Sequence, residues 1–434
     1  MNNAEIILWG NVIGAVTWLD DRNVGVFQYT PQFVKSGIEL APLKMPLQDA
    51  PYEFKNLAWI TFRGLPGLLA DSLPDKFGNA VIDAWLALQG RAVSSFNPVE
   101  RLCYIGTRGM GALEFKPAII NTFSKNQAVE VAKLVDLSNR VLSQRTELYG
   151  AFTGADDKNA LDDILRVGTS AGGARAKAIL AWNPITNEFR SGQIDVSQGF
   201  EYWIMKFDGI SNNRDKEISD PQGFGKIEYA YYLMACEAGI EMMPCRLHQE
   251  GGRSHFMTKR FDRTAKGKKL HMQSLGAITH SDFNQSNCFS YEQALQTMKN
   301  IGLTQKDINQ QVLRTMFNIV GRNQDDHVKN IAFIMNQKGE WRLSPAFDLT
   351  YAYNPDGDWT NSHQMSVNGK QTNFEANDLI LFAEIGNIKP KIAKEMLEKV
   401  INALKLWPYF ANQVGINETI IDQIHSAHRL SLLN

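Results

Sequence analysis

A chain of 434 residues exceeds the usual size of one domain, so we expect two or three parts that share hydrophobic cores. Its 45 basic and 46 acidic residues argue against a protein that coats nucleic acid through bulk charge. The four cysteines are too few and too scattered for a disulfide framework or a CxxC metal site, and we expect reduced thiols.

The N-terminal residues contain no basic region followed by a long apolar stretch, so no signal peptide is visible. No run approaches the roughly 18 apolar residues that a membrane-spanning helix needs. We therefore expect a cytoplasmic protein without membrane contact.

The first part of the chain is predicted to be rich in strands. Three segments with many β-branched and aromatic residues, separated by turn residues, are 6–9, 12–19 and 24–29. The segment RGLPGLLADSLPDKFG then contains proline and glycine breaks, and a helix is predicted over 80–88. We place a β-rich N-terminal subdomain at residues 1–135.

Residues 136–290 are interpreted as a nucleotide-binding part. They contain the glycine-dense loop GTSAGGARAK at 168–177 and a predicted strand, EYWIMKFD, at 201–208. A helix is predicted next, because apolar residues from Ile227 to Ala238 recur at helical spacing. A further strand is predicted over 255–261.

The remainder, 291–434, is predicted to be a mainly helical catalytic lobe. One apolar stripe ends at Gly321, just ahead of NQDDHVKN, and a second runs from Ile392 to Trp407 and is stopped by Pro408. Strands first and helices later favour a two-lobed α+β enzyme.

The loop DDHVKN lies between the first of these helices and a strand predicted over 331–335. Phosphoryl transfer to a hydroxyl needs a group that accepts the proton, and oxygen ligands for Mg²⁺. Asp325 and Asn330 have the spacing of the base and the metal ligand in a kinase catalytic loop. The alternative is a polar turn, and Asp326 is interpreted as an N-cap or a solvated turn carboxylate.

Asp348, in LSPAFDLT, follows a hydrophobic stretch and an aromatic residue, as the Mg²⁺-binding aspartate of a kinase does. Two strands could bring Asn330 and Asp348 to one metal, and such hard oxygen ligands suit Mg²⁺ rather than zinc.

Two further features suit a bound nucleotide. Ionising Lys206 within an apolar strand is costly without an anionic partner, and a phosphate would be one, although the lysine could instead lie on a half-exposed face. The glycine-rich loop can bring backbone N–H groups to phosphates, although it lacks the Walker A spacing and such stretches are often ordinary turns.

Through most of its length the chain resembles the HipA family of serine/threonine-protein kinase toxins from type II toxin–antitoxin systems. The resemblance is carried by five motifs that occur in the family's order: SAGGARAK, WIMKFD, KRFDR, NQDDHVKN and SPAFD. The segment GLPGLLADSLPDKFG also resembles the N-terminal lobe of that family. The resemblance implies a protein-kinase-like fold with a β-rich N-terminal lobe and a mainly helical C-terminal lobe.

The resemblance also implies roles for single residues. Asp325 would be the catalytic base, Asn330 and Asp348 the Mg²⁺ ligands, and Ser170 a site of autophosphorylation that shuts the enzyme down. The residues expected to bind ATP are Gly172, Gly173, Ala174, Arg175, Lys177, Lys206, Lys259, Phe261, Asp262 and His327.

Alternatives remain for some of these roles. His327 could be a turn histidine that caps a carbonyl, and Ser170 an ordinary loop hydroxyl. Ala176 and Lys259 depart from residues common in the family, which leaves the rigidity of the phosphate loop and the adenine contacts open.

The leading hypothesis is an ATP- and Mg²⁺-dependent kinase that phosphorylates itself and a translation-related protein, such as an aminoacyl-tRNA synthetase, and so arrests growth. The resemblance implies a small helix-turn-helix antitoxin, HipB-like and dimeric, and operator DNA contacted through that complex. Two other readings stay open: a small-molecule kinase on the same scaffold, and a non-catalytic corepressor subunit of an antitoxin–DNA complex.

Overall fold

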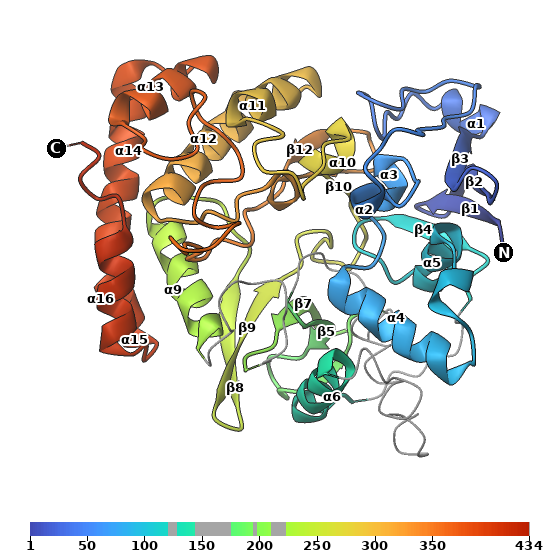
Figure 1. The fold of residues 1–434 in the computed structure, drawn as a ribbon, viewed down its shortest axis with the longest axis horizontal. Helices are drawn as coiled ribbons and strands as arrows, with labels where there is room; N and C mark the ends of the chain where they lie inside the picture. The colour runs from blue at the N-terminus through green and yellow to red at the C-terminus, as the bar shows by residue number, and fades with distance from the viewer. Residues whose placement is uncertain (120–127, 144–174, 194–197, 210–222, 434) are drawn as a thin grey trace.

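The computed structural model describes residues 1–119, 128–143, 175–193, 198–209 and 223–433. Within them, a four-stranded, a five-stranded and a three-stranded sheet are accompanied by a large group of helices near the C-terminus (Figure 1). This α+β architecture, with strands early and helices late, confirms the predicted fold class. The predicted divisions at 135 and 290 stay a prediction.

The N-terminal sheet is antiparallel and has the order β3-β2-β1-β4. Its strands are β1 (Asn3–Leu8), β2 (Asn11–Leu19), β3 (Val24–Tyr29) and β4 (Leu113–Lys116). Alternate side chains such as Val16 and Trp18 are buried, which is the period-two pattern of a sheet with one covered face. The three predicted strands are confirmed, and β4 was not predicted.

Several helices lie between β3 and β4 in the chain. They are α1 (Pro31–Val34), α2 (Trp59–Phe62), α3 (Gly67–Ala70), α4 (Lys76–Leu88), η1 (Val93–Ser95) and α5 (Pro98–Ile105). Among them, α1 and α5 pack on this sheet. Helix α4 begins before the predicted residue 80, because Asp75 is its N-cap and accepts a hydrogen bond from the Gly78 N–H at 2.7 Å.

The five-stranded sheet is antiparallel, in the order β6-β5-β7-β9-β8. Its strands are β5 (Lys177–Trp182), β6 (Phe189–Ser191), β7 (Glu201–Lys206), β8 (Cys245–Glu250) and β9 (Arg253–Lys259). Helices α4 and α6 (Val131–Ser143) share a core with β5 and β7, while α9 (Phe224–Glu237) packs on β8 and β9.

The three-stranded sheet, β10-β11-β12, consists of β10 (His271–Ser274), β11 (Ala332–Met335) and β12 (Trp341–Leu343). Trp341 donates its indole N–H to the Glu39 carbonyl at 3.1 Å, and Trp9 donates to the Lys269 carbonyl at 2.9 Å. These bonds attach the N-terminal part of the chain to the rest.

The helical part has one continuous core with α9. Its elements are α10 (Leu275–Thr279), α11 (Tyr291–Asn300), α12 (Gln305–Val320), η2 (Val328–Asn330), α13 (Ala376–Ile385), α14 (Pro390–Lys405), α15 (Trp407–Gln413) and α16 (Glu418–Ala427). The prediction that Pro408 stops a helix reaching Trp407 was wrong. Pro408 lies in the first turn of α15, a position that needs no backbone donor, and α14 ends at Lys405.

The four cysteines carry free thiols, as expected. Of the helices in the described part of the chain, none combines the length and the apolar character needed to cross a bilayer.

Candidate active site

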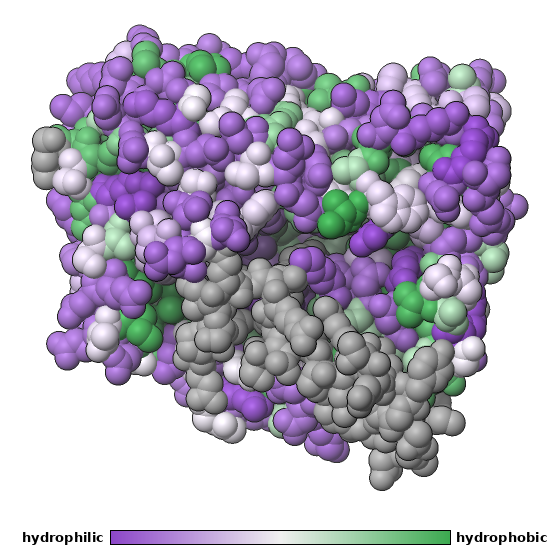
Figure 2. Space-filling model, in the orientation of Figure 1, coloured by the Kyte–Doolittle hydropathy of each residue, from purple (hydrophilic) through white to green (hydrophobic). Residues whose placement is uncertain are grey.

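A cleft of about 1710 Å³ is lined by several of the residues that the sequence singled out. Its walls include Lys206, Asp325, Asn330 and Asp348, which come from β7, the loop after α12, η2 and the segment after β12. The surface is hollowed near the middle of the view in Figure 2. The structure therefore brings the predicted base, both predicted metal ligands and the strand lysine to one cavity.

Strand pairing explains how two of these residues meet. The antiparallel partners β11 and β12 pair Phe333 with Leu343, so the start of β11 and the end of β12 lie at the same end of the sheet. Asn330 precedes β11 and Asp348 follows β12. Both side chains consequently emerge at that end and line the cleft.

Lys206 lies at the centre of a cluster of charged side chains. Its ammonium group contacts a carboxylate oxygen of Asp348 and lies 2.6 Å from Oε1 of Glu228 on α9. Burial opposes the charge, but the two carboxylates outweigh it and raise the pKa of Lys206. Burial likewise opposes the charge on Asp348, and Lys206 and Lys177 overcome it and lower the pKa of that carboxyl.

A second lysine lies beside Lys206 on the neighbouring strand. Lys177 on β5 is the register partner of Lys206 on β7, and both line the cleft. The Lys177 Nζ lies 3.8 Å from Oδ2 of Asp75, and both side chains are buried. Burial lowers the pKa of Lys177 and raises that of Asp75, and each group partly counters the shift of the other. The N-terminal part of the chain thus supplies a carboxylate to this cluster.

Arg175 adds a third cation to the cleft. Its guanidinium lies 4.1 Å from the centre of the Phe224 ring and 3.9 Å from Oε2 of Glu228. The carboxylate of Glu228, which is 3% exposed, therefore forms ion pairs with both Arg175 and Lys206. A buried carboxylate that orients a strand lysine is the arrangement kinases use to hold phosphates.

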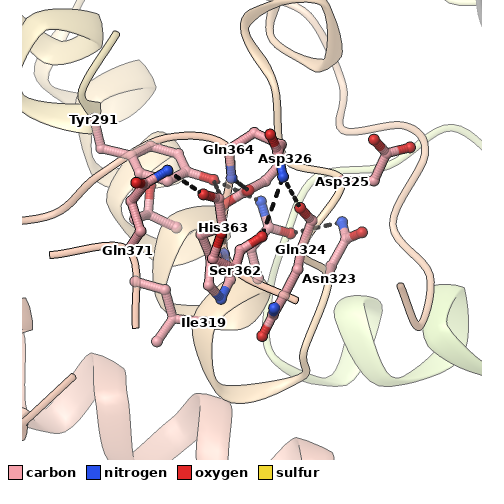
Figure 3. Close-up of polar contacts among 12 residues, drawn as sticks. Tyr291, Ile319, Asn323, Gln324, Asp325, Asp326, Ser362, His363, Gln364 and Gln371 are labelled. Atoms are coloured by element: carbon pink, nitrogen blue, oxygen red, sulfur yellow. Dashed lines mark hydrogen bonds and ion pairs between the residues drawn. The ribbon is translucent and has the colours of Figure 1, made fainter. Parts of the chain in front are cut away.

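The loop after α12 places two adjacent carboxylates in opposite directions. Figure 3 shows Asp326 within a polar network and Asp325 turned away from it. Asp326 is 3% exposed and accepts hydrogen bonds from Tyr291, His363 and the Gln364 backbone, each at 2.7 Å. The interpretation of Asp326 as an N-cap or a solvated turn carboxylate was wrong, because the carboxyl group is buried and these three donors replace its contacts with water.

Asp325 faces the cleft and has few partners. Its Oδ1 accepts the indole N–H of Trp359 at 2.7 Å and lies 3.9 Å from Nε2 of His327. Its backbone carbonyl accepts the side-chain N–H of Asn330 at 2.8 Å. This bond fixes the Asn330 amide and leaves the amide oxygen as the atom that can bind a metal.

These groups fit a nucleotide with Mg²⁺. No group of three or more His, Cys, Asp or Glu side chains that could hold a metal occurs among the described residues. Mg²⁺ commonly takes only one or two protein oxygens and completes its shell with phosphates and waters, which matches Asn330 and Asp348. The cations Arg175, Lys177 and Lys206 line the same cleft and would face the phosphates.

His327 lines the cleft, and its Nδ1 is buried without a hydrogen-bond partner among the described residues. It therefore does not cap a carbonyl through that nitrogen. A contact of His327 with a nucleotide stays a prediction.

Three predicted ATP contacts, Lys259, Phe261 and Asp262, are not among the residues that line the cleft. Lys259 pairs with Glu201 at 2.6 Å. Asp262 is fully buried and accepts bonds from Arg260, Arg263 and the Gly111 backbone, an arrangement that fits a structural role. A nucleotide contact at these three positions stays a prediction.

Comparison with known proteins gives the family. The HipA-like C-terminal domain matches residues 169–407, and the HipA N-terminal domain matches residues 4–116.

The chain belongs to the HipA family.

A solved complex of HipA, HipB and operator DNA from Shewanella oneidensis MR-1 has a HipA similar to this chain, with 16% identity and a TM-score of 0.66 over 98% of this chain and 95% of that one. The likeness supports the two-lobed fold. A kinase from Helicobacter pylori, the proinflammatory CtkA, matches 61% of this chain and 94% of its own, at 12% identity and a TM-score of 0.33, which is too low to indicate a shared fold. No curated protein matches the sequence.

Four of the residues expected in this HipA-family site lie outside the described residues: Ser170, Gly172, Gly173 and Ala174. Three others that contact the site were missed by the sequence analysis: Glu228, Asp75 and Trp359. The burial of Glu228 could have been predicted from the sequence, because the residue lies one position from Ile227 and three from Tyr231, on the buried face of α9. No local pattern in the sequence indicated Trp359, since a long irregular segment separates it from Asp325.

Proposed function

We propose that this HipA-family chain is an ATP- and Mg²⁺-dependent serine/threonine protein kinase. The observation that carries the proposal is the convergence of Asp325, Asn330, Asp348 and Lys206 on one cleft, with Lys206 paired to buried Glu228. A base, two oxygen ligands and a paired strand lysine are the parts that phosphoryl transfer to a hydroxyl requires.

Each residue would have a distinct task. Lys206, Lys177 and Arg175 would bind and orient the phosphates, while Asn330 and Asp348 would hold Mg²⁺. When bound, the metal neutralises charge on the transferred phosphoryl group. Asp325 would accept the proton of the substrate hydroxyl as the new P–O bond forms.

The wider role rests on family membership. We propose that the protein is the toxin of a toxin–antitoxin pair in the cytoplasm, that it phosphorylates a translation-related protein, and that it autophosphorylates Ser170. A small helix-turn-helix antitoxin, acting as a dimer, would be its partner, and operator DNA would be reached through that complex. The HipA of Shewanella is similarly found with HipB and operator DNA.

Transfer of labelled phosphate from ATP, to the protein itself and to the proteins of a cell lysate, tests this function. We expect wild type to transfer label, Asp325→Ala to transfer none, and Asp422→Ala, at an exposed position of α16, to behave as wild type. Wild type without transfer, or Asp325→Ala with equal transfer, would refute the kinase.

Mass spectrometry of the labelled protein separates autophosphorylation from the rest of the proposal. Phosphate on Ser170 in wild type, and none there in Asp325→Ala, is the expected result.

A further inference from the structure

The loop that carries Asp325 rests on a buried polar network around Asp326 and His363 (Figure 3). The network continues to Arg429, which follows α16. His363, fully buried, contacts Oδ2 of Asp326 through Nδ1 at 2.7 Å. Its other ring nitrogen, Nε2, lies 3.0 Å from Nη1 of Arg429. Asp326, His363 and Arg429 thus form a chain of three polar groups beneath the loop.

Arg429 fixes the protonation of His363. A guanidinium has only donors, so Nε2 of His363 must be the acceptor, and the single ring proton is on Nδ1, where it is donated to Asp326. Burial, joined by the nearby Arg429 and Arg322, lowers the pKa of His363 and keeps the ring neutral, although Asp326 acts in the other direction.

The same network holds a segment of the chain, residues 359–364, against the loop. The Gln324 side chain donates to the Thr360 carbonyl at 2.9 Å, and the Gln364 side chain donates to the Gln324 carbonyl at 3.3 Å. The Gln364 backbone N–H donates to Asp326. Both ends of the segment are therefore attached to residues next to Asp325.

Trp359, at the start of this segment, is attached to Asp325 itself. Its indole N–H donates to Oδ1 at 2.7 Å, and the ring lines the cleft. A carboxylate has two oxygens, and a donor on one of them restricts rotation about the side-chain bond and leaves Oδ2 to receive a proton.

We propose that residues 359–364 form a clamp that orients Asp325, with Trp359 as the positioning residue and Asp326, His363 and Arg429 as its buried support. This inference rests on the proposed kinase function, since it assigns to the clamp the orientation of that reaction's base. Trp359 is not a catalytic residue in this account, because its indole acts through Asp325.

The buried support of the clamp extends beyond the residues that the family's domains match. The match to the HipA-like C-terminal domain ends at residue 407, while Arg429 follows α16 and also donates to the Ile319 carbonyl and to Gln324. The C-terminal segment thus supports the candidate site, which neither its position in the sequence nor the matched domain indicates.

Trp359→Phe tests the clamp, because it keeps an aromatic ring and removes only the indole N–H. We expect kcat for phosphate transfer to fall between about 10- and 100-fold, since misplacing a catalytic group by about 1 Å can cost about 100-fold. The apparent KM for ATP should stay within about 2-fold of wild type, because the indole orients the base and not the nucleotide.

Trp341→Phe is the matched control. It removes an indole N–H bond of the same kind, to the Glu39 carbonyl, at a residue that does not line the cleft. We expect wild-type kinetics from it.

Arg429→Met and Arg429→Lys test the buried support. We expect Arg429→Met to reduce kcat as Trp359→Phe does, and Arg429→Lys to restore most of it, because a lysine still donates to His363. If Arg429→Met fails to fold, Trp359→Phe alone decides.

Full kcat in Trp359→Phe would overturn the clamp, and so would a rise in KM for ATP at unchanged kcat. A wild-type protein that transfers no phosphate would instead refute the kinase function, so the two failures are distinguishable.

Discussion

Two parts of the cleft lining are built from different interactions. In one part, the loop around Asp325, the buried carboxylate of Asp326 is held by hydrogen bonds from neutral side chains and a backbone group. The other part is a cluster of ion pairs that joins Lys206 to Glu228 and Asp348, and Lys177 to Asp75.

This difference indicates in which part of the cleft a bound ligand can change the contacts between side chains. The donors to Asp326 are buried and have fixed geometry, so the loop is preorganised before anything binds. In the charged cluster, Lys206 occupies an oxygen of Asp348 that Mg²⁺ would take. Binding of metal and nucleotide should therefore replace ion pairs within the cluster by contacts with the ligand, and should leave the loop unchanged.

Removing the charge of Asp348 should have the largest effect. We expect Asp348→Asn to lower phosphate transfer by about 1,000-fold or more, because one of two metal oxygens loses its charge. Asp356→Asn, an exposed residue of the same segment, is the control for transfer assays with labelled ATP. Near-normal transfer in Asp348→Asn would place the metal elsewhere.

Lys206→Met should affect both activity and stability. The buried carboxylate of Glu228 loses its nearest cation, so we expect a loss of about 3 kcal/mol in the free energy of unfolding and about 100-fold in transfer. Adding Glu228→Gln should recover stability in urea unfolding without recovering transfer. If the double variant also recovers transfer, Lys206 does not anchor phosphate.

The two adjacent carboxylates allow a direct comparison of stability. Asp326→Asn should lose about 2 kcal/mol in urea unfolding, because a buried acceptor of three hydrogen bonds loses its charge. Asp325→Asn should lose well under about 1 kcal/mol, because its side chain is 32% exposed. Equal losses would contradict the different roles assigned to the two residues.

The pH dependence of stability should also differ between the loop network, which contains His363, and the charged cluster, which contains Asp348. Since the pKa of His363 is lowered by burial, the unfolded chain binds a proton below about pH 6.5 that the folded chain does not, and stability falls by at most about 1.4 kcal/mol per pH unit. The pKa of Asp348 is also lowered, so its contribution is fully present above about pH 4 and is lost only below that.

Urea unfolding at pH 7 and pH 5.5 measures this difference. We expect wild type to lose about 1 kcal/mol more than His363→Gln over that interval. The same change in both proteins would mean that His363 is not held neutral in the folded state.

Local signals in the sequence predicted much of this molecule, and contacts between distant segments account for what was missed. The strand at 24–29 and the α12 stripe that ends at Gly321 follow from side-chain periodicity and a glycine stop, which act over a few residues. The motif spacing of Asp325 and Asn330 predicted a site shared with Asp348, and all three residues line one cleft, while their roles stay a prediction.

Long-range contacts could not be predicted in this way. The register that sets Lys177 opposite Lys206 depends on the pairing of β5 with β7, and the approach of Asp75 depends on how the N-terminal part packs. Asp326 resembled a turn residue because its three donors come from α11 and from residues 363–364, which no local pattern connects to it.

A crystal structure with a non-hydrolysable ATP analogue and Mn²⁺, located by its anomalous signal, tests the central claim most directly. We predict manganese between the Asn330 amide oxygen and the Asp348 carboxylate, Lys206 moved from Asp348 to a phosphate, and Asp325 still bonded to Trp359. Manganese bound away from Asn330 and Asp348, or a nucleotide outside this cleft, would contradict the account.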